Sequence, residues 1–144
     1  MTTLELEHER KEAREQDQPT VLLLDDDCGT LLVLHAVLER TAVRVIECED
    51  EDCVLKLSKE LAGIDLLVAD IILKTSNGPA VVKAIRPHQP SMRVLYISGF
   101  SLSELMRRGL LHPEEMIAGQ VEFLPKPFSP QEFLGTVEKL LERN

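Results

Sequence analysis

The chain alternates between short apolar runs and longer segments whose apolar residues recur every three or four positions. Five of the runs are bounded by turn-type or charged residues, which is typical of buried strands. These predicted strands are TVLLLD (20–25), VRVIE (43–47), DLLVAD (65–70), MRVLYIS (92–98) and VEFL (121–124). Because the runs are continuous rather than alternating, we expect strands that are apolar on both faces.

Helix signals follow each predicted strand. The last helix is the clearest, because Ser129 and Glu132 form a capping box around Pro130 ahead of an apolar stripe. Four earlier helices are indicated by the spacing of Leu31, Leu34 and Leu38, by acidic residues at 50–52, by Pro79 at a first helical position, and by a weaker pattern from Ser101 to Leu111. The sequence therefore predicts five helices.

Strands that alternate with helices favour a parallel α/β sheet covered on both faces. The 144 residues, 44% of them hydrophobic, suffice for one core and leave no room for a second folded domain. Residues 1–18 are charged and carry too few apolar residues for an amphipathic stripe. We expect one domain over residues 19–144 behind a charged N-terminal tail over residues 1–18.

The net charge and the hydropathy of the chain argue against nucleic-acid-binding and membrane-bound classes of protein. The chain has 25 acidic and 16 basic residues, a formal net charge of −9, which opposes binding to nucleic acid and to anionic membranes. No apolar run approaches the roughly 18 residues of a membrane span, and the N-terminus lacks a signal-peptide core. We expect a cytoplasmic protein with no nucleic-acid or membrane partner.

The three cysteines, Cys28, Cys48 and Cys53, have no zinc-type spacing and leave one residue unpaired. In a cytoplasmic protein we expect small buried thiols rather than a disulfide.

Candidate chemistry lies at the ends of the predicted strands. Acidic residues 25–27 follow the first strand, Asp70 ends the third, Ser98 ends the fourth, and Lys126 follows the fifth. In open parallel sheets the carboxyl ends of the strands form the ligand site. Clustered carboxylates need a cation, and their oxygens suit Mg²⁺. With Lys126 and Ser98, the metal would neutralise a phosphoryl group in transit to one aspartate.

From Pro19 to Asn144 the chain resembles the response-regulator receiver domains of bacterial two-component signalling. The resemblance is carried by Asp25 and Asp26 in LLLDDD, Asp70 in LLVADIILKTSNG, Ser98 in VLYISGF, and Lys126 with Pro127 in FLPKPF. It implies a flavodoxin-like, doubly wound five-stranded parallel sheet of order 2-1-3-4-5. The segment GLLHPEEM is similar to receivers of hybrid histidine kinases.

The resemblance also implies roles for the acidic residues. Asp70 matches the residue that receives a phosphoryl group from a histidine kinase or phosphotransfer protein. Asp26, Asp70 and the backbone carbonyl of Ile72 match the Mg²⁺ ligands, and Asp25 assists through water. In such a domain the phosphoryl group is held on the protein, so we expect no turnover of an external substrate.

Other positions match the residues that read the phosphoryl group. Lys126 and Ser98 correspond to the phosphoryl-contacting lysine and hydroxyl, and Phe123 to the aromatic switch residue. Ile72 and Phe100 correspond to positions that flank the path of attacking water, and their apolar side chains are expected to shield the phosphoryl group. A downstream protein target is expected on the face of the fourth and fifth helices and the fifth strand.

Some positions depart from the family pattern. Lys74 replaces a common proline, which is expected to loosen its loop, and Phe123 lacks the hydroxyl of the more frequent tyrosine. Asp27 is expected to cap the first helix rather than to bind metal. A cis peptide is expected between Lys126 and Pro127 from the resemblance.

Two alternatives remain open. The stretch DDDCGTL is similar to the nucleophile motif of haloacid-dehalogenase phosphatases, with Asp25 as nucleophile, Asp27 as general acid, and Ser98 and Lys126 at later positions. Cys28 is an insertion in that motif, and no acidic cluster completes a metal site after the lysine. An interaction-only pseudo-receiver is the second alternative, and the presence of every phosphorylation residue argues against it.

Overall fold

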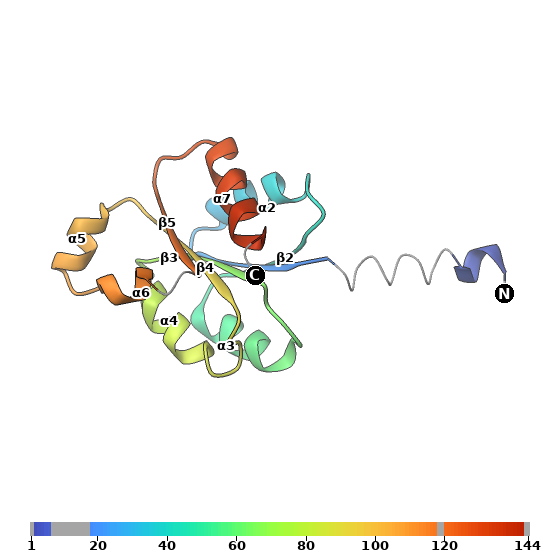
Figure 1. The fold of residues 1–144 in the computed structure, drawn as a ribbon, viewed down its shortest axis with the longest axis horizontal. Coiled ribbons are helices and arrows are strands. Elements are labelled where there is room, and N and C mark those ends of the chain that lie inside the picture. The colour runs from blue at the N-terminus through green and yellow to red at the C-terminus, as the bar shows by residue number, and fades with distance from the viewer. Residues whose placement is uncertain (1, 7–17, 118–119, 143–144) are drawn as a thin grey trace.

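The structure is a computed structural model that describes residues 2–6, 18–117 and 120–142 of the chain. A five-stranded parallel sheet forms its centre, with the strand order β2-β1-β3-β4-β5 (Figure 1). The strands are β1 (Thr20–Leu24), β2 (Arg44–Cys48), β3 (Leu66–Asp70), β4 (Arg93–Ser98) and β5 (Val121–Pro125). The expected flavodoxin-like architecture and its strand order are confirmed.

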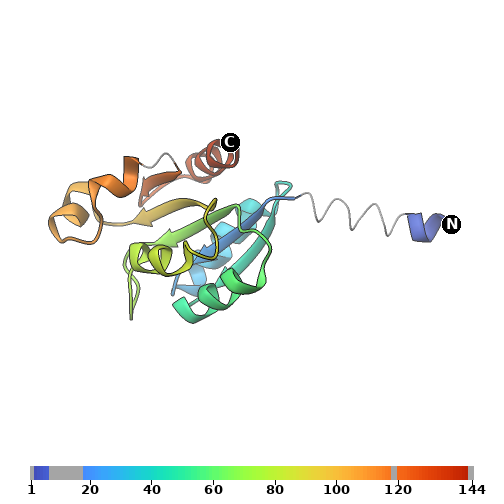
Figure 2. The ribbon, with the colours of Figure 1, turned by 60° about the horizontal axis from the view of Figure 1, so that its bottom comes forward.

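Helices cover both faces of the sheet (Figures 1 and 2). On one face α2 (Cys28–Leu38) and α7 (Pro130–Glu142) pack, and on the other α3 (Glu51–Glu60) and α4 (Gly78–Ile85). Successive strand side chains point to opposite faces. Leu22 therefore joins the apolar cluster under α3 and α4, while Leu23 joins the cluster under α2 and α7.

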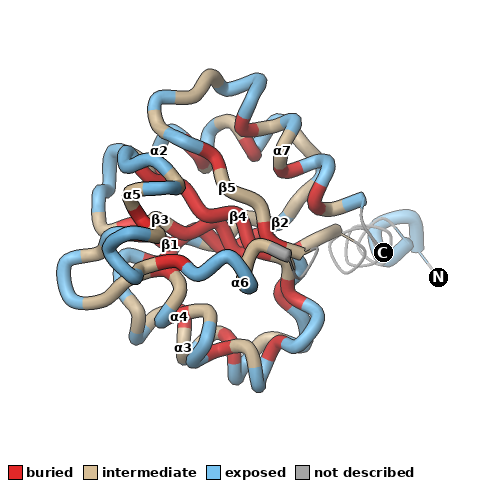
Figure 3. Tube along the Cα trace, turned by 60° about the vertical axis from the view of Figure 1, so that its left-hand side comes forward, coloured by how far each residue is buried: buried red, intermediate tan, exposed pale blue. Residues whose placement is uncertain are grey.

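The strands in the middle of the sheet are buried, as Figure 3 shows in red. The expectation that all strands are apolar on both faces is wrong for β2, where Arg44 and Glu47 are exposed. The reason is that β2 is an edge strand that pairs only with β1 among the described strands. Charged side chains on an edge strand also discourage pairing with other chains.

The segment after β4 differs from the expected single helix over 101–111. It contains two short helices, α5 (Leu102–Arg107) and α6 (Pro113–Ile117), so the helix count exceeds the expected five. Gly109 separates them with a φ of 73°, a left-handed conformation that glycine adopts at low cost. Pro113 then starts α6, where its fixed φ suits the first helical position. In Figure 1 this segment extends past the left-hand edge of the sheet.

A disulfide joins Cys48, at the end of β2, to Cys53, in the first turn of α3. Its two Cα atoms are 5.6 Å apart. The expectation of three buried thiols is therefore wrong, and the remaining cysteine, Cys28, is free and exposed. The turn between β2 and α3 folds the chain back over a sequence separation of 5, which brings the two sulfur atoms together.

The expected N-terminal tail lies mostly outside the described residues, since the structure describes only residues 2–6 and 18 of it. Among the described residues, no helix is both long enough and apolar enough to cross a membrane.

Candidate functional site

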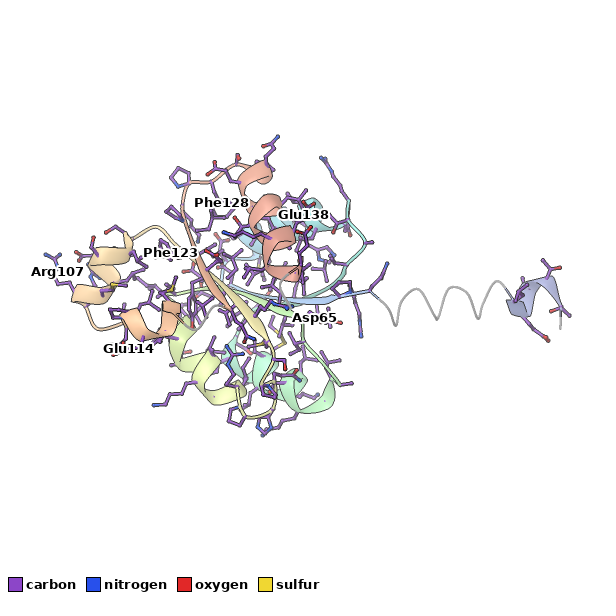
Figure 4. All side chains as sticks on the ribbon, viewed as in Figure 1. Asp65, Arg107, Glu114, Phe123, Phe128 and Glu138 are labelled. Carbon is purple, nitrogen blue, oxygen red and sulfur yellow. A yellow bond between two sulfur atoms is a disulfide. The ribbon has the colours of Figure 1, made fainter. Side chains whose placement is uncertain are left out.

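The carboxyl ends of β1 and β3, which are neighbours in the sheet, bring two aspartates together. Asp25 directly follows β1 and Asp70 ends β3. Lys126, just after β5, reaches the same point: its Nζ lies 2.9 Å from Asp70 Oδ2 and 3.8 Å from Asp25 Oδ2. This is the edge at which the winding of the sheet changes direction, where open α/β sheets bind ligands. Asp65, labelled in Figure 4, lies at the opposite edge.

Asp25 is the most buried carboxylate of this group, with 2% of its surface exposed. Its Oδ1 accepts the backbone N–H of Asp27 at 2.9 Å, whereas its buried Oδ2 accepts no hydrogen bond. Burial raises the pKa of Asp25 above its ordinary value, and the neighbouring charge of Asp70 raises it further. A buried carboxylate oxygen without a donor is a natural partner for a cation.

Lys126 supplies positive charge to both carboxylates. Burial alone would lower its pKa, but the hydrogen bond and charge of Asp70, with the charge of Asp25, raise that pKa above its ordinary value. The lysine is positioned by its own backbone N–H, which donates to the carbonyl of Ser98 at 2.8 Å. The peptide bond between Lys126 and Pro127 is cis, as expected.

Asp26 faces the loop between β3 and α4. Its Oδ2 accepts the backbone N–H of Lys74 at 2.7 Å, and Asp70 Oδ1 accepts the backbone N–H of Ile72 at 3.1 Å. An isolated antiparallel bridge between Ile72 and Asn77 closes the loop. Lys74, which was expected to loosen this loop, ties the loop to Asp26 through its backbone N–H. A proline at this position has no N–H to donate, so Lys74 allows a contact that the common residue would prevent.

Gly78 closes the same loop at the start of α4. Its N–H donates to the carbonyl of Ile71 at 2.8 Å. A Cβ at this position would lie 2.9 Å from the carbonyl oxygen of Asp70 and 3.2 Å from Cε1 of the buried Tyr96. The loop therefore approaches Asp70 as closely as it does because residue 78 has no side chain.

Gly78→Ala is expected to lower the free energy of unfolding by about 1–3 kcal/mol, because the added methyl group forces the backbone of β3 or the ring of Tyr96 to move. Urea denaturation of the purified protein measures the change. Gly135→Ala is the matched control, since a Cβ there meets no atom within 4 Å. In the exposed part of α7 the control should raise stability by about 0.5–1 kcal/mol. A Gly78→Ala variant as stable as the parent would contradict the close approach.

The hydroxyl group of Ser98 is buried at the end of β4, where its Oγ accepts the backbone N–H of Phe100 at 3.0 Å. Phe100 and Ile72 are 39% and 37% exposed, so neither side chain is buried in the core. The guanidinium of Arg108 lies 4.5 Å from the ring centre of Phe100, and Arg108 Nε donates to Glu104 at 2.8 Å. Sequence reasoning missed Arg108, although its spacing of four residues from Glu104 on a helix is a known signal for an ion pair.

Phe123 lies on β5, where Figure 4 labels it. It is half-buried and packs against the apolar cluster on the α3 and α4 side of the sheet. The structure thus places the expected switch residue on a strand adjacent to β4, whose last residue is Ser98.

Asp27 caps α2, as expected. Its Oδ1 accepts the N–H of Gly29 at 2.9 Å, and its Oδ2 accepts the hydroxyl of Thr30 at 3.1 Å. These hydrogen bonds hold the pKa of Asp27 below its ordinary value. A carboxylate stabilised in its charged form is poorly suited to donate a proton, as the phosphatase alternative requires of this residue.

The carboxylates at this edge are the candidate ligands of the expected Mg²⁺. Within residues 2–6, 18–117 and 120–142, no group of three or more His, Cys, Asp or Glu side chains is arranged to enclose a metal. Mg²⁺ does not need such a cage, because it commonly takes one or two carboxylates and keeps several waters. The buried Asp25 Oδ2 accepts no hydrogen bond, because its nearest cation, Lys126 Nζ, lies 3.8 Å away, so this oxygen can still accept from a metal-bound water. These residues therefore fit a hydrated Mg²⁺.

Known proteins resemble this chain over most of its length. The response regulator receiver domain family matches residues 21–138. Sensor kinase CckA of Brucella abortus (strain 2308) is 29% identical over 125 residues, which are 86% of this chain and 13% of CckA. Transcriptional regulatory protein CpxR of Escherichia coli (strain K12) is 30% identical over 125 residues, 86% of this chain and 50% of CpxR. The chain thus spans half or less of these relatives.

Solved structures agree with the match. A response regulator receiver protein from Sinorhizobium medicae WSM419 is 28% identical with a TM-score of 0.72, over 88% of this chain and 96% of that one. The receiver domain of the hybrid histidine kinase CckA is 25% identical with a TM-score of 0.69, over 85% of this chain and 99% of that one. The family match covers well over half of the sequence, and the chain belongs to the response regulator receiver domain family.

Proposed function

We propose that Asp70 accepts a phosphoryl group from the phosphohistidine of a histidine kinase or phosphotransfer protein. A carboxylate oxygen of Asp70 attacks phosphorus, and the bond from phosphorus to the donor imidazole breaks, with its electron pair leaving on nitrogen. The observation that carries this proposal is the contact of Lys126 Nζ with Asp70 Oδ2 at 2.9 Å, beside the buried Asp25. A fixed ammonium next to the nucleophile offsets charge that phosphoryl transfer brings to the site.

Asp26, Asp70 and the carbonyl of Ile72 would hold Mg²⁺, with Asp25 assisting through water. When bound, the ion supplies positive charge against the phosphoryl oxygens. The residues of the chain then have separate tasks. Asp70 provides the nucleophile, and Asp25 and Asp26 provide the negative charge that makes a divalent cation favourable beside it.

Under the same proposal, phosphorylation of Asp70 switches the protein between two states that differ in partner binding. Lys126 and the hydroxyl of Ser98 contact the phosphoryl group on Asp70, and Phe123 changes its packing in response. The output is altered binding of a downstream protein to the face of β5, α7 and the segment of α5 and α6. The protein encounters both its histidine kinase and its downstream target in the cytoplasm. Phe123 is half-buried on β5, the strand that pairs with β4 and its terminal Ser98, and this position supports the assignment.

The proposal is tested by incubating the protein with acetyl phosphate and Mg²⁺ and measuring its intact mass. We expect a gain of one phosphoryl group, because the small donor supplies the same electrophilic phosphorus as a phosphohistidine. A chelator of divalent cations should prevent the gain. Absence of any gain in Mg²⁺ would contradict the proposal. Continuous hydrolysis of small phosphomonoesters, lost in Asp25→Asn, would support the phosphatase alternative instead.

A further inference from the structure

The Cys48–Cys53 disulfide lies directly beside the acidic site. The carbonyl of Cys48 accepts the backbone N–H of Asp25 at 3.2 Å. Cys53 belongs to the first turn of α3, and the start of this helix, at Asp50 and Glu51, lines a cleft of about 240 Å³ together with Asp26. Cys48 therefore holds the backbone of Asp25, and Cys53 belongs to the helix whose start forms a wall of the cleft beside Asp26.

The backbone around the disulfide has other restraints. Cys48 is paired with Leu24 in the ladder between β1 and β2. The N–H of Cys53 donates to Asp50 Oδ1 at 2.9 Å, which caps α3 independently of the sulfur atoms. The bond closes a loop with a sequence separation of only 5, and short loops gain less from cross-linking than long ones. The fold therefore does not depend on this bond, and the two sulfur atoms stay close to one another when it is broken.

The two cysteines differ in exposure. Cys48 is 1% exposed, whereas Cys53, in the first turn of α3, is half-buried. An incoming thiolate attacks the sulfur atom that it can reach, so Cys53 is the point of attack and Cys48 the leaving group. In a reducing compartment, a disulfide in a folded protein is transient, catalytic or redox-sensing rather than structural.

We propose that Cys48 and Cys53 form a redox-active pair whose substrate is a dithiol reductant, and that the disulfide form takes a phosphoryl group on Asp70 faster than the dithiol form. The second half rests on the proposed function. A reductant thiolate attacks Cys53 Sγ, the disulfide breaks, and its electron pair leaves on Cys48 Sγ, which takes a proton. The second reductant thiolate then attacks the reductant sulfur of the mixed disulfide. This forms the oxidised reductant and releases Cys53, which also takes a proton.

Phosphorylation of Asp70 should be slower in the dithiol form because the two cysteines are held by different parts of the fold. After reduction the sulfur atoms separate from bonding distance to van der Waals contact. Cys48 is held by the sheet and by the core around it, so the displacement falls on the first turn of α3. That turn lines the cleft beside Asp26, and its movement disturbs the carboxylates that must be in place for Mg²⁺ and phosphoryl transfer.

The test compares the disulfide and dithiol forms of the full chain, prepared with an oxidised or a reduced dithiol and verified by thiol alkylation and mass. At equal Mg²⁺ and acetyl phosphate, we expect the dithiol form to be labelled about fivefold more slowly, the lower end of typical coupling between sites. The double variant Cys48→Ser/Cys53→Ser should show the slow rate under both conditions. Cys28→Ser should keep the redox response, because Cys28 is outside the disulfide.

A second measurement separates this proposal from the proposed function. Amide hydrogen exchange at Lys74 reports its hydrogen bond to Asp26 Oδ2, in the cleft that the start of α3 lines, and it should be faster in the dithiol form whether or not Asp70 is labelled. If neither form is labelled, the proposed function fails, and the exchange rates alone decide the redox proposal. Failure to form the disulfide at any ratio of oxidised to reduced dithiol would overturn it, as would equal labelling rates or, without labelling, equal exchange rates.

Discussion

Replacing Asp70 by asparagine is expected to abolish labelling by acetyl phosphate, so that intact mass shows no phosphorylated protein at a Mg²⁺ concentration where the parent is fully labelled. The reason is chemical: a neutral amide oxygen is a poor nucleophile, and asparagine cannot form the acyl phosphate. The shape of the site should survive, since the amide oxygen can still accept the N–H of Ile72 that Asp70 Oδ1 accepts at 3.1 Å. Thermal unfolding of the variant checks that it is folded.

Asp27→Asn is the matched control for Asp70→Asn. Asparagine caps helices as well as aspartate does, so α2 keeps its N-cap and labelling should equal that of the parent. A label that persists in Asp70→Asn would show that another residue is the acceptor. Loss of labelling in Asp27→Asn would instead favour the phosphatase alternative, in which residue 27 must transfer a proton.

The parts of the fold that sequence predicted are those in which a local pattern has one structural solution. A continuous apolar run as short as five or six residues between turn-type or charged residues is typical of a strand covered on both faces, and this holds for β1 and β3. Since parallel strands end at one edge, acids at these strand ends had to meet. Asp25 and Asp70 are therefore close in space although 45 positions separate them in the sequence.

The parts that sequence missed depend on three-dimensional neighbours. The spacing of Cys48 and Cys53 does not show whether the chain between them turns back, and only the packing of α3 against β2 brings the sulfur atoms together. The edge position of β2 likewise follows from the order of the whole sheet. The backbone N–H of Lys74 is invisible to arguments from side chains, yet it is the group that Asp26 accepts.

The lifetime of the phosphorylated state should depend on Ile72 and Phe100. An acyl phosphate is hydrolysed when water lines up behind phosphorus, and a polar side chain beside that path can position the water. Both side chains are exposed. Their backbones are tied to site residues, because the N–H of Ile72 donates to Asp70 Oδ1 and the N–H of Phe100 donates to Ser98 Oγ. Exposed apolar groups there repel water without positioning it, so we expect slow loss of phosphate from the parent.

Ile72→Asn and Phe100→Glu should each speed this loss about tenfold, less than the 10²–10⁴ of full general acid–base catalysis, because the new groups position water without being tuned to take its proton. The measurement is the decay of phosphorylated protein by intact mass after the donor is removed, with Mg²⁺ present and no kinase.

Phe100→Leu is the control that keeps an apolar side chain at this position while removing the ring on which Arg108 stacks at 4.5 Å. Its decay should stay close to that of the parent if exclusion of water is what matters, and should approach that of Phe100→Glu if the stacking by Arg108 is what holds the shield in place. Leu32→Asn, an exposed apolar position on α2, controls for the change in surface polarity and should leave the decay unaltered. Because a shield that is lost can only admit water, unchanged or slower decay in both Ile72→Asn and Phe100→Glu would show that neither side chain protects the phosphoryl group.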